Sequence, residues 1–286
     1  MLHIWKASGE ELATVPVEEF DVLSLKQHLQ PLCGASRFRQ RLLHGEENLS
    51  DDIRLDAPMD LQLVLLPFID ATDEEGILFV EAAARGLVSQ VEEMLQRPQS
   101  PDATNWDGTT ALRDAAMQGS VDMTRLLLAS GASQNVCDYN GRSPLWAGCF
   151  QGHVAIVQLL LTARADKETP ANNGDTPLWA ALHHDRLDIA KLLLEAGPER
   201  EKRDADGVSL LGYASMKGHI DIARLLLEAG ANLRARDKMG MTPLFAGSFY
   251  GHVEIVQLLL AARADAGFFF GMLLANLQGV FPFESF

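Results

Sequence analysis

The stretch Asn173-Gly-Asp-Thr-Pro-Leu-Trp-Ala-Ala-Leu-His183, with Asp188-Ile-Ala-Lys-Leu-Leu-Leu194 after it, recurs in variant form every 33 residues. A leading glycine marks each unit, at Gly108, Gly141, Gly174, Gly207 and Gly240. A Leu-Leu-Leu triplet follows at the same step, at 126–128, 159–161, 192–194, 225–227 and 258–260. A second glycine column holds Gly119, Gly152, Gly218 and Gly251, with Asp185 in the third unit. Five units in register at one period indicate a repeat protein whose units stack on each other.

The residue types within a unit predict a turn followed by two short helices. Dipeptides such as Asp107-Gly108 and Asn173-Gly174 favour a turn, because glycine adopts positive φ without strain. The following Ser or Thr is a typical helix N-cap, and Pro144, Pro177 and Pro243 suit the first helical turn. The second column glycine ends this helix. A second helix, for example from His252 to Ala262, carries an apolar face at helical spacing.

The tetrads that open the units resemble the Thr-Pro-Leu-His motif of ankyrin repeats. They read Thr110-Ala-Leu-Arg113, Ser143-Pro-Leu-Trp146, Thr176-Pro-Leu-Trp179, Ser209-Leu-Leu-Gly212 and Thr242-Pro-Leu-Phe245. The resemblance covers residues 74–266 and implies an α-solenoid of helix-turn-helix units joined by β-hairpins. We expect five repeats over 107–266 and a degenerate N-terminal capping repeat over 74–106, where the tetrad is missing.

The first seventy residues predict a separate α+β module. Residues 2–6, 12–17 and 60–66 read as strands, the span 22–32 has helical spacing, and 41–45 reads as a strand running into a turn. With Gln40-Arg-Leu-Leu-His-Gly-Glu-Glu-Asn-Leu49 and Met59-Asp-Leu-Gln-Leu-Val-Leu65, this order resembles a ubiquitin-like β-grasp domain over 1–70.

Two departures from ubiquitin limit what this resemblance implies. The last strand runs into Leu66-Pro67-Phe68 rather than a Gly-Gly terminus, so the module is a fixed domain and not a transferable modifier. Leu43 and Val64 match two positions of the apolar patch that ubiquitin-binding proteins grip, and the third has no counterpart. The module either docks to proteasome or ligase components through this patch or serves as a stabilising cap for the repeats.

The resemblance to ankyrin repeats implies a protein partner bound on the concave side, at the first helices and hairpin tips. Aromatic residues replace the usual tetrad histidine three times, and such residues are enriched among interface hot spots. The predicted protein-binding residues are Trp106, Arg113, Tyr139, Trp146, Phe150, Trp179, His183, Phe245, Phe249 and Tyr250. The alternative reading for the tetrad aromatics is packing between neighbouring units.

Composition and motifs argue against other classes of function. The net charge of −15 disfavours nucleic-acid binding by phosphate neutralisation and a polybasic membrane surface. We find no catalytic motif and predict neither an enzyme nor a cofactor. His153, His219 and His252 lie on separate units, so we expect backbone hydrogen bonds rather than a metal site. Three cysteines without paired spacing and no secretory signal suggest a cytoplasmic or nuclear protein. We also expect a monomer.

The last twenty residues break the repeat pattern. Six of the 13 phenylalanines lie in Gly267–Phe286, where a terminal repeat should present a polar outer face. This apolar tail reads as an improvised cap, as a membrane or partner-docking segment, or as the product of a truncated array. The sequence therefore predicts a non-enzymatic scaffold or adaptor, with a ubiquitin-pathway adaptor and a membrane-associated scaffold as alternatives.

Overall fold

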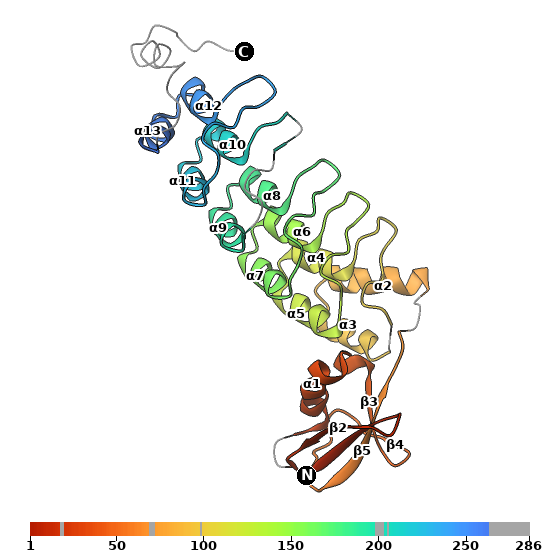
Figure 1. Ribbon diagram of the computed structural model, residues 1–286. Coiled ribbons are helices and arrows are strands. Elements are labelled where there is room, and N and C mark those ends of the chain that lie inside the picture. The colour runs from red at the N-terminus through yellow and green to blue at the C-terminus, as the bar shows by residue number, and fades with distance from the viewer. Residues whose placement is uncertain (18–19, 69–71, 98, 198–202, 205, 263–286) are drawn as a thin grey trace. The chain divides into compact units, whose positions relative to one another are not determined.

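A computed structural model describes residues 1–17, 20–68, 72–97, 99–197, 203–204 and 206–262 (Figure 1). The predicted apolar tail, 267–286, lies outside these residues. The chain divides into two compact units, Met1–Tyr139 and Asn140–Phe286. Each unit is described by itself below.

The first unit begins with a mixed five-stranded sheet and one long helix. Its elements are β1 (Leu2–Lys6), β2 (Glu11–Val15), α1 (Val22–Cys33), the 3-10 turn η2 (Arg37–Arg39), β3 (Gln40–His44), β4 (Glu47–Asn48) and β5 (Met59–Leu65). The strand order is β2-β1-β5-β3-β4, with β1 parallel to β5 and the other pairs antiparallel. This arrangement is compatible with the predicted ubiquitin-like β-grasp fold and adds two short elements, η2 and β4. We call it the β-grasp module.

One face of this sheet and the helix α1 form the core of the β-grasp module. Strand alternation turns Ile4, Leu42 and Leu61 to the same face, and all three are fully buried. Leu25 and Leu29, one helical turn apart on α1, cover them and are equally buried. The opposite face of the sheet carries half-buried and exposed side chains, among them Leu43, Gln62 and Val64.

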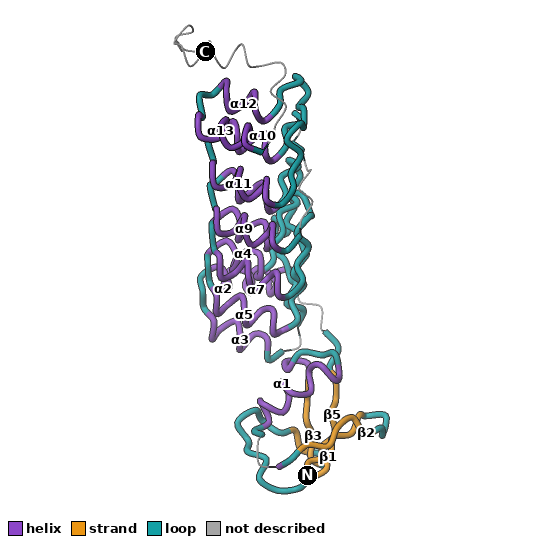
Figure 2. Tube along the Cα trace, turned by 60° about the vertical axis from the view of Figure 1, so that its left-hand side comes forward, coloured by secondary structure: helices purple, strands orange, loops and turns teal. Residues whose placement is uncertain are grey.

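Helix pairs follow at the predicted period. In the first unit they are α2 (Asp73–Ala84) with α3 (Val88–Leu95), and α4 (Ala111–Gln118) with α5 (Val121–Ser130). In the second unit they are α6 (Pro144–Gln151) with α7 (Val154–Thr162), α8 (Pro177–His183) with α9 (Leu187–Glu195), α10 (Leu210–Lys217) with α11 (Ile220–Glu228), and α12 (Pro243–Phe249) with α13 (Val253–Ala261). Within the second unit, first helices and second helices form two rows, and the long connecting loops lie on one side (Figures 1 and 2).

The predicted capping chemistry is present in every full repeat. The side chains of Thr110, Ser143, Thr176, Ser209 and Thr242 each accept a hydrogen bond from the backbone N–H three residues on. Gly119, Gly152 and Gly218 then end their helices in the left-handed conformation. Asp185 adopts the same region with φ of 52° although it is not a glycine.

Stacked second helices bury the repeat's leucines. The middle leucine of every triplet is fully buried, at Leu127, Leu160, Leu193, Leu226 and Leu259. Gly148 and Gly247 lie inside first helices, where an added Cβ would come within 3.4 Å of Val157 and 3.3 Å of Ile255. Their missing side chains let the two helices of a repeat approach closely.

Candidate protein-binding surfaces

The N-caps place the tetrad aromatics at the start of the first helices. Ser143 Oγ accepts the backbone N–H of Trp146 at 3.1 Å, and Thr176 Oγ1 accepts that of Trp179 at 3.4 Å. The helix then directs both indoles into the stack, where Trp146 is 4% and Trp179 1% exposed. Both indole N–H groups lack a hydrogen-bond partner among the described residues. Phe245, at the same position of α12, is half-buried.

Rings from three successive first helices contact each other. Phe150 stacks on Trp146 with centroids 4.9 Å apart, and the imidazole of His184 meets Phe150 edge-on at 4.3 Å. Tyr213 of α10 contacts Trp179 at 5.2 Å and His183 at 4.9 Å. We call Trp146, Phe150, Trp179, His183, His184 and Tyr213 the aromatic row. Its indoles form the buried layer, and the phenyl, phenol and imidazole rings are exposed or half-buried above them.

The last described repeat carries a smaller exposed cluster. Phe249 stacks on Phe245 at 5.7 Å and meets Tyr250 edge-on at 5.2 Å. Phe249 and Tyr250 are 48% and 47% exposed. Next to them a small cavity of about 30 Å³ lies where Gly212 provides no side chain, lined by Val208, Met216, Met241, Ala246 and Tyr250 among others. The aromatic column is therefore interrupted at α10 by a notch with apolar walls.

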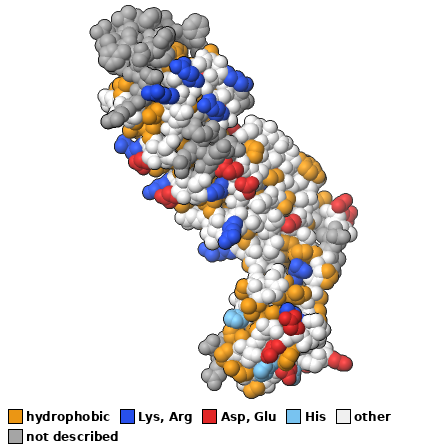
Figure 3. Space-filling model, viewed as in Figure 1, with side chains coloured by type: hydrophobic (Ala, Val, Ile, Leu, Met, Phe, Trp, Pro, Cys, Tyr) orange, Lys and Arg blue, Asp and Glu red, His pale blue; other side chains and the backbone are white. Residues whose placement is uncertain are grey.

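Charged groups border the aromatic row. The guanidinium of Arg142 lies 5.0 Å from the Trp146 ring centroid, and Lys217 Nζ lies 5.8 Å from that of Tyr213. Asp175 Oδ2 lies 3.7 Å from His183 Nδ1. Partial desolvation, and then the neighbouring Arg186 and His183, lower the pKa of His184. Over much of the surface seen in Figure 3, positive and negative side chains are interspersed.

In the first unit, two aromatic residues stand out at the hairpin tips. Trp106 is 80% exposed and Tyr139 is 73% exposed. The Tyr139 N–H donates to Asp107 O at 3.1 Å, and its ring lies so close to Gly108 that an added Cβ there would be 2.6 Å from it. The preceding hairpin thus supports Tyr139, which fits the predicted role of the tips as contact sites.

Arg113 is engaged inside the first unit. Its side chain is 11% exposed, and its guanidinium pairs with Asp114 at 3.1 Å and with Asp138 at 3.2 Å. Burial raises the pKa of Asp114 in spite of this neighbouring cation. A partner would have to compete with two carboxylates for Arg113.

The two residues of the predicted ubiquitin-like patch share the open face of the sheet. Arg41 pairs with Val64 and Leu43 with Gln62 across β3 and β5, so strand alternation places Leu43 and Val64 on one side. Both are half-buried. Trp5 of β1 also pairs with Gln62, and its indole donates to Asp60 at 3.3 Å. The face therefore carries a third large apolar side chain.

His252, His219 and Cys149 all contact or are buried by other parts of the chain. His252 Nε2 lies 3.1 Å from the carbonyl oxygen of Met216, which confirms a backbone partner for this histidine. His219 Nδ1 lies 3.5 Å from Asp185 Oδ1. Cys149 is fully buried, and burial raises the pKa of its thiol. Within the described ranges, no group of three or more His, Cys, Asp or Glu could hold a metal ion.

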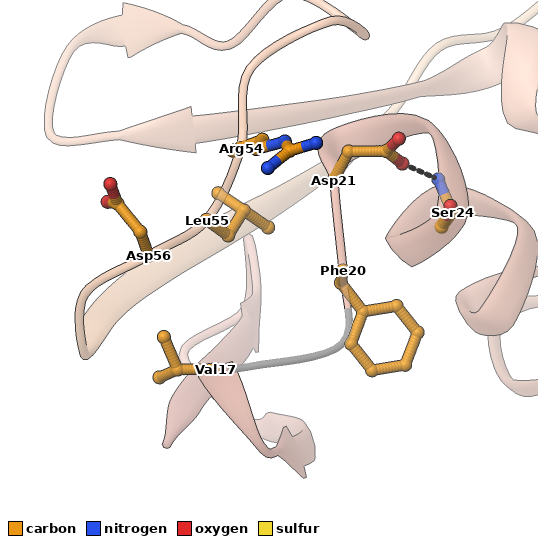
Figure 4. Close-up of a pocket in the computed structure, with 7 residues that line it drawn as sticks. All are labelled: Val17, Phe20, Asp21, Ser24, Arg54, Leu55 and Asp56. Carbon is orange, nitrogen blue, oxygen red and sulfur yellow. Dashed lines mark hydrogen bonds between the residues drawn. The ribbon is translucent and has the colours of Figure 1, made fainter.

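A hollow of about 540 Å³ lies in the β-grasp module (Figure 4). Val17, Phe20 and Leu55 line it together with Asp21, Ser24, Arg54 and Asp56. The Asp21 carboxylate already accepts the N–H of Ser24 at 2.7 Å and caps α1. The helix N-terminus that faces the hollow is therefore satisfied within the chain.

Two members of the aromatic row were missed by the sequence analysis. Tyr213 stands one position after the tetrad, where the other units have Asp114, Ala147, Ala180 and Ala246. A column-by-column comparison of the units would have revealed it as the single large residue. The second is His184, which contacts Phe150 while His183 contacts Tyr213.

The period, the caps and the stacked helix pairs define a repeat protein of the ankyrin class. Comparison with known protein families matches "Ankyrin repeats (3 copies)" to residues 79–171 and 196–268, and "Ankyrin repeat" to residues 173–205. The chain belongs to the ankyrin-repeat family, whose members are generally non-enzymatic protein-interaction modules. A search among curated proteins returned no match. Within the described residues, no helix has the length and apolar content of a membrane span.

Proposed function

We propose that the chain is a scaffold or adaptor that binds a protein partner through the first helices of its second unit. The observation that carries this proposal is the aromatic row, in which half-buried and exposed rings from α6, α8 and α10 contact each other. Large rigid rings bury much area at a small loss of conformational entropy. A stretch of rings on a protein surface is typical of an interaction site.

Burial divides the predicted binding residues into contact and support. Trp146 and Trp179 hold the layer above them and are too deeply buried to touch a partner without rearrangement. Phe150, His183 and Tyr213 form the contact layer of the aromatic row. Phe249 and Tyr250 extend it at the last described repeat, beside the notch at Gly212. The partner would be a segment with apolar side chains, one of them small enough for this notch.

Trp106 and Tyr139 form a second contact site in the first unit. Both protrude from neighbouring hairpins, and neither is needed to fill the core. They would add a peripheral contact to the same class of partner.

Affinity capture from native lysate with mass-spectrometric readout tests this proposal. We expect partners bound by the full chain to be lost from the combined variant Phe150→Ala, Tyr213→Ala, Phe249→Ala and Tyr250→Ala. Leu78→Ala is the control, because Leu78 is also exposed and apolar but lies on α2. Retention of the same partners by a folded quadruple variant would contradict the assignment of the surface.

The open face of the β-grasp module favours a second candidate, an adaptor for the ubiquitin system. Leu43 and Val64 lie on adjacent strands of that face. We expect capture of proteasome or ligase components to depend on these two residues. The double variant Leu43→Ala, Val64→Ala should no longer capture these components. The control Leu65→Ala, which changes an exposed neighbour on β5, should still capture them. Capture of such components by both variants equally would argue against this role.

A further inference from the structure

The segment Arg37-Phe-Arg-Gln-Arg41 joins the β-grasp module to the first helix pairs of the same unit. Its odd-numbered residues are arginines, and each has a partner. Arg39 stays within the module, donating from Nε to the carbonyl of Leu66 at 2.8 Å and lying 4.5 Å from the ring centroid of Phe68. Arg39 thereby fixes the exit of β5 toward the repeats.

Arg37 and Arg41 both reach α3. Arg37 Nη2 lies 2.6 Å from Glu92 Oε1, and Arg41 Nη2 donates to the carbonyl of Gln96 at 3.1 Å. Gln96 is the C-cap of α3, and this helix has neither a left-handed capping residue nor a basic side chain in its last turn. Helix C-termini carry unsatisfied carbonyls and partial negative charge, which cations stabilise. The β-grasp module supplies the cation that α3 itself lacks.

The ion pair of Arg37 is embedded in a small network. Asp51 Oδ1 lies 2.5 Å from Lys26 Nζ, and Asp51 Oδ2 lies 3.9 Å from Arg37 Nη1. The side chains of Lys26 and Arg37 are 5% and 14% exposed, so water screens these charges weakly. Arg37 is thus shared between a carboxylate of the module and a carboxylate of the repeat.

Apolar burial accompanies these polar contacts. Phe38 is 4% exposed, yet it stands outside the hydrophobic cluster that forms the core of the β-grasp module. Ser36, at the start of η2, faces the end of α5, where a Cβ added to Gly131 would lie 3.9 Å from the Ser36 Cβ. Figures 1 and 2 both show α1 and the start of β3 as the part of the module nearest to α3.

We propose that the β-grasp module is a built-in brace of the repeat array, docked through residues 36–41 on the C-terminal ends of α3 and α5. These contacts join helices of two successive pairs at one edge of the array, while Leu78 of α2 remains exposed. The module and the first two helix pairs then unfold as one unit. Arg41 shares the open sheet face with Leu43 and Val64, so a receptor bound there also meets the end of α3.

Hydrogen exchange of the full chain, followed by mass spectrometry, tests this docking. In the double variant Arg37→Glu, Arg41→Glu, we expect the backbone amides of residues 88–97 to exchange about tenfold faster or more. The reason is that α3 loses two charge-assisted hydrogen bonds. Arg37→Glu combined with Glu92→Arg should restore part of the protection lost in either single variant, because the pair with α3 re-forms while Asp51 then faces a second carboxylate. Arg54→Glu, an exposed arginine of the same module, is the control and should leave α3 unchanged.

A milder variant keeps the proposal testable if charge reversal prevents folding. Glu92→Gln removes the charge from the repeat side only and should raise exchange in α3 and in η2 together. Unchanged α3 protection in a folded variant lacking Arg37 and Arg41 would overturn the docking. Separate unfolding transitions for residues 2–65 and 73–130 in the unaltered chain would also overturn it.

Discussion

The ring of Tyr213 stands at 78° to the indole of Trp179, with the two centroids 5.2 Å apart. The residues come from α10 and α8, and the edge-to-face geometry is one that aromatic pairs favour. Because Gly212 leaves the usual aromatic position of α10 without a side chain, Tyr213 alone continues the row into this repeat. The contact links packing between repeats to the surface offered to a partner.

Replacement of Tyr213 should affect both stability and binding. We expect Tyr213→Ala to lower the free energy of unfolding by about 1–3 kcal/mol, from lost apolar burial and the lost ring pair. Tyr213→Phe keeps the ring and should stay close to the unaltered protein. Urea denaturation checks the first effect and partner capture the second. Equal stability of the Ala and Phe variants would show that the ring contact contributes nothing.

Two glycines of one column should respond differently to alanine. Gly141 and Gly174 both have positive φ, 73° and 88°. A Cβ at Gly141 would lie 2.9 Å from the backbone nitrogen of Asn172, whereas a Cβ at Gly174 meets nothing within 4 Å. Gly174→Ala should cost about 1 kcal/mol for its backbone conformation, and Gly141→Ala at least about 1 kcal/mol more for the clash. Denaturation midpoints of the two variants measure this difference in stability. A Gly141→Ala variant as stable as Gly174→Ala would contradict the clash.

The N-cap of α12 gives a test of local helix stability. Thr242 Oγ1 accepts the N–H of Phe245 at 3.2 Å. Thr242→Ala should lower the free energy of unfolding by about 1 kcal/mol, because the half-buried backbone N–H of Phe245 loses its acceptor. Thr242→Ser retains the hydroxyl and should recover most of this loss. Thermal unfolding of both variants provides the comparison, and an Ala variant as stable as the Ser variant would rule out the cap.

His184 should make stability sensitive to mild acid. Its pKa is lowered in the folded chain by burial first and by Arg186 and His183 next. The unfolded chain therefore binds the proton more readily, and stability falls as pH drops below the ordinary histidine value of about 6.5. An NMR titration of the imidazole should show the lowered pKa. Between about pH 7.5 and pH 5.5, the free energy of unfolding of His184→Gln should therefore fall less than that of the unaltered protein.

The sequence was sufficient to predict the repeat, because its features depend on local chemistry. Ser or Thr before each first helix, proline at its first turn and glycine at its end are recognisable one residue at a time. The period of 33 then places the same elements in each unit. Strands β1, β2, β3 and β5 of the β-grasp module were found in the same way, from the alternation of their residues, and the two-residue strand β4 was not.

What the sequence did not disclose depends on contacts between distant residues. Trp146 and Trp179 occupy the position of an exposed aromatic in the sequence pattern, and only the stacked neighbours show that they are buried. The contacts of Arg37 and Arg41 span 55 residues and follow no period. Asp185 takes the place of a glycine, yet it keeps the left-handed conformation and its carboxylate lies close to His219. The replacement of glycine by aspartate in the sequence predicted neither feature.

The parallel pairing of β1 with β5 has a mechanical consequence. The N-terminus leads into β1, and β5 leads out toward the repeats, so tension between the first residue and the array pulls these neighbouring strands in opposite directions along their length. Their backbone hydrogen bonds lie across this direction and are loaded together in shear, instead of opening one after another. Force applied from Met1 to the repeats is therefore carried by all of these hydrogen bonds at once.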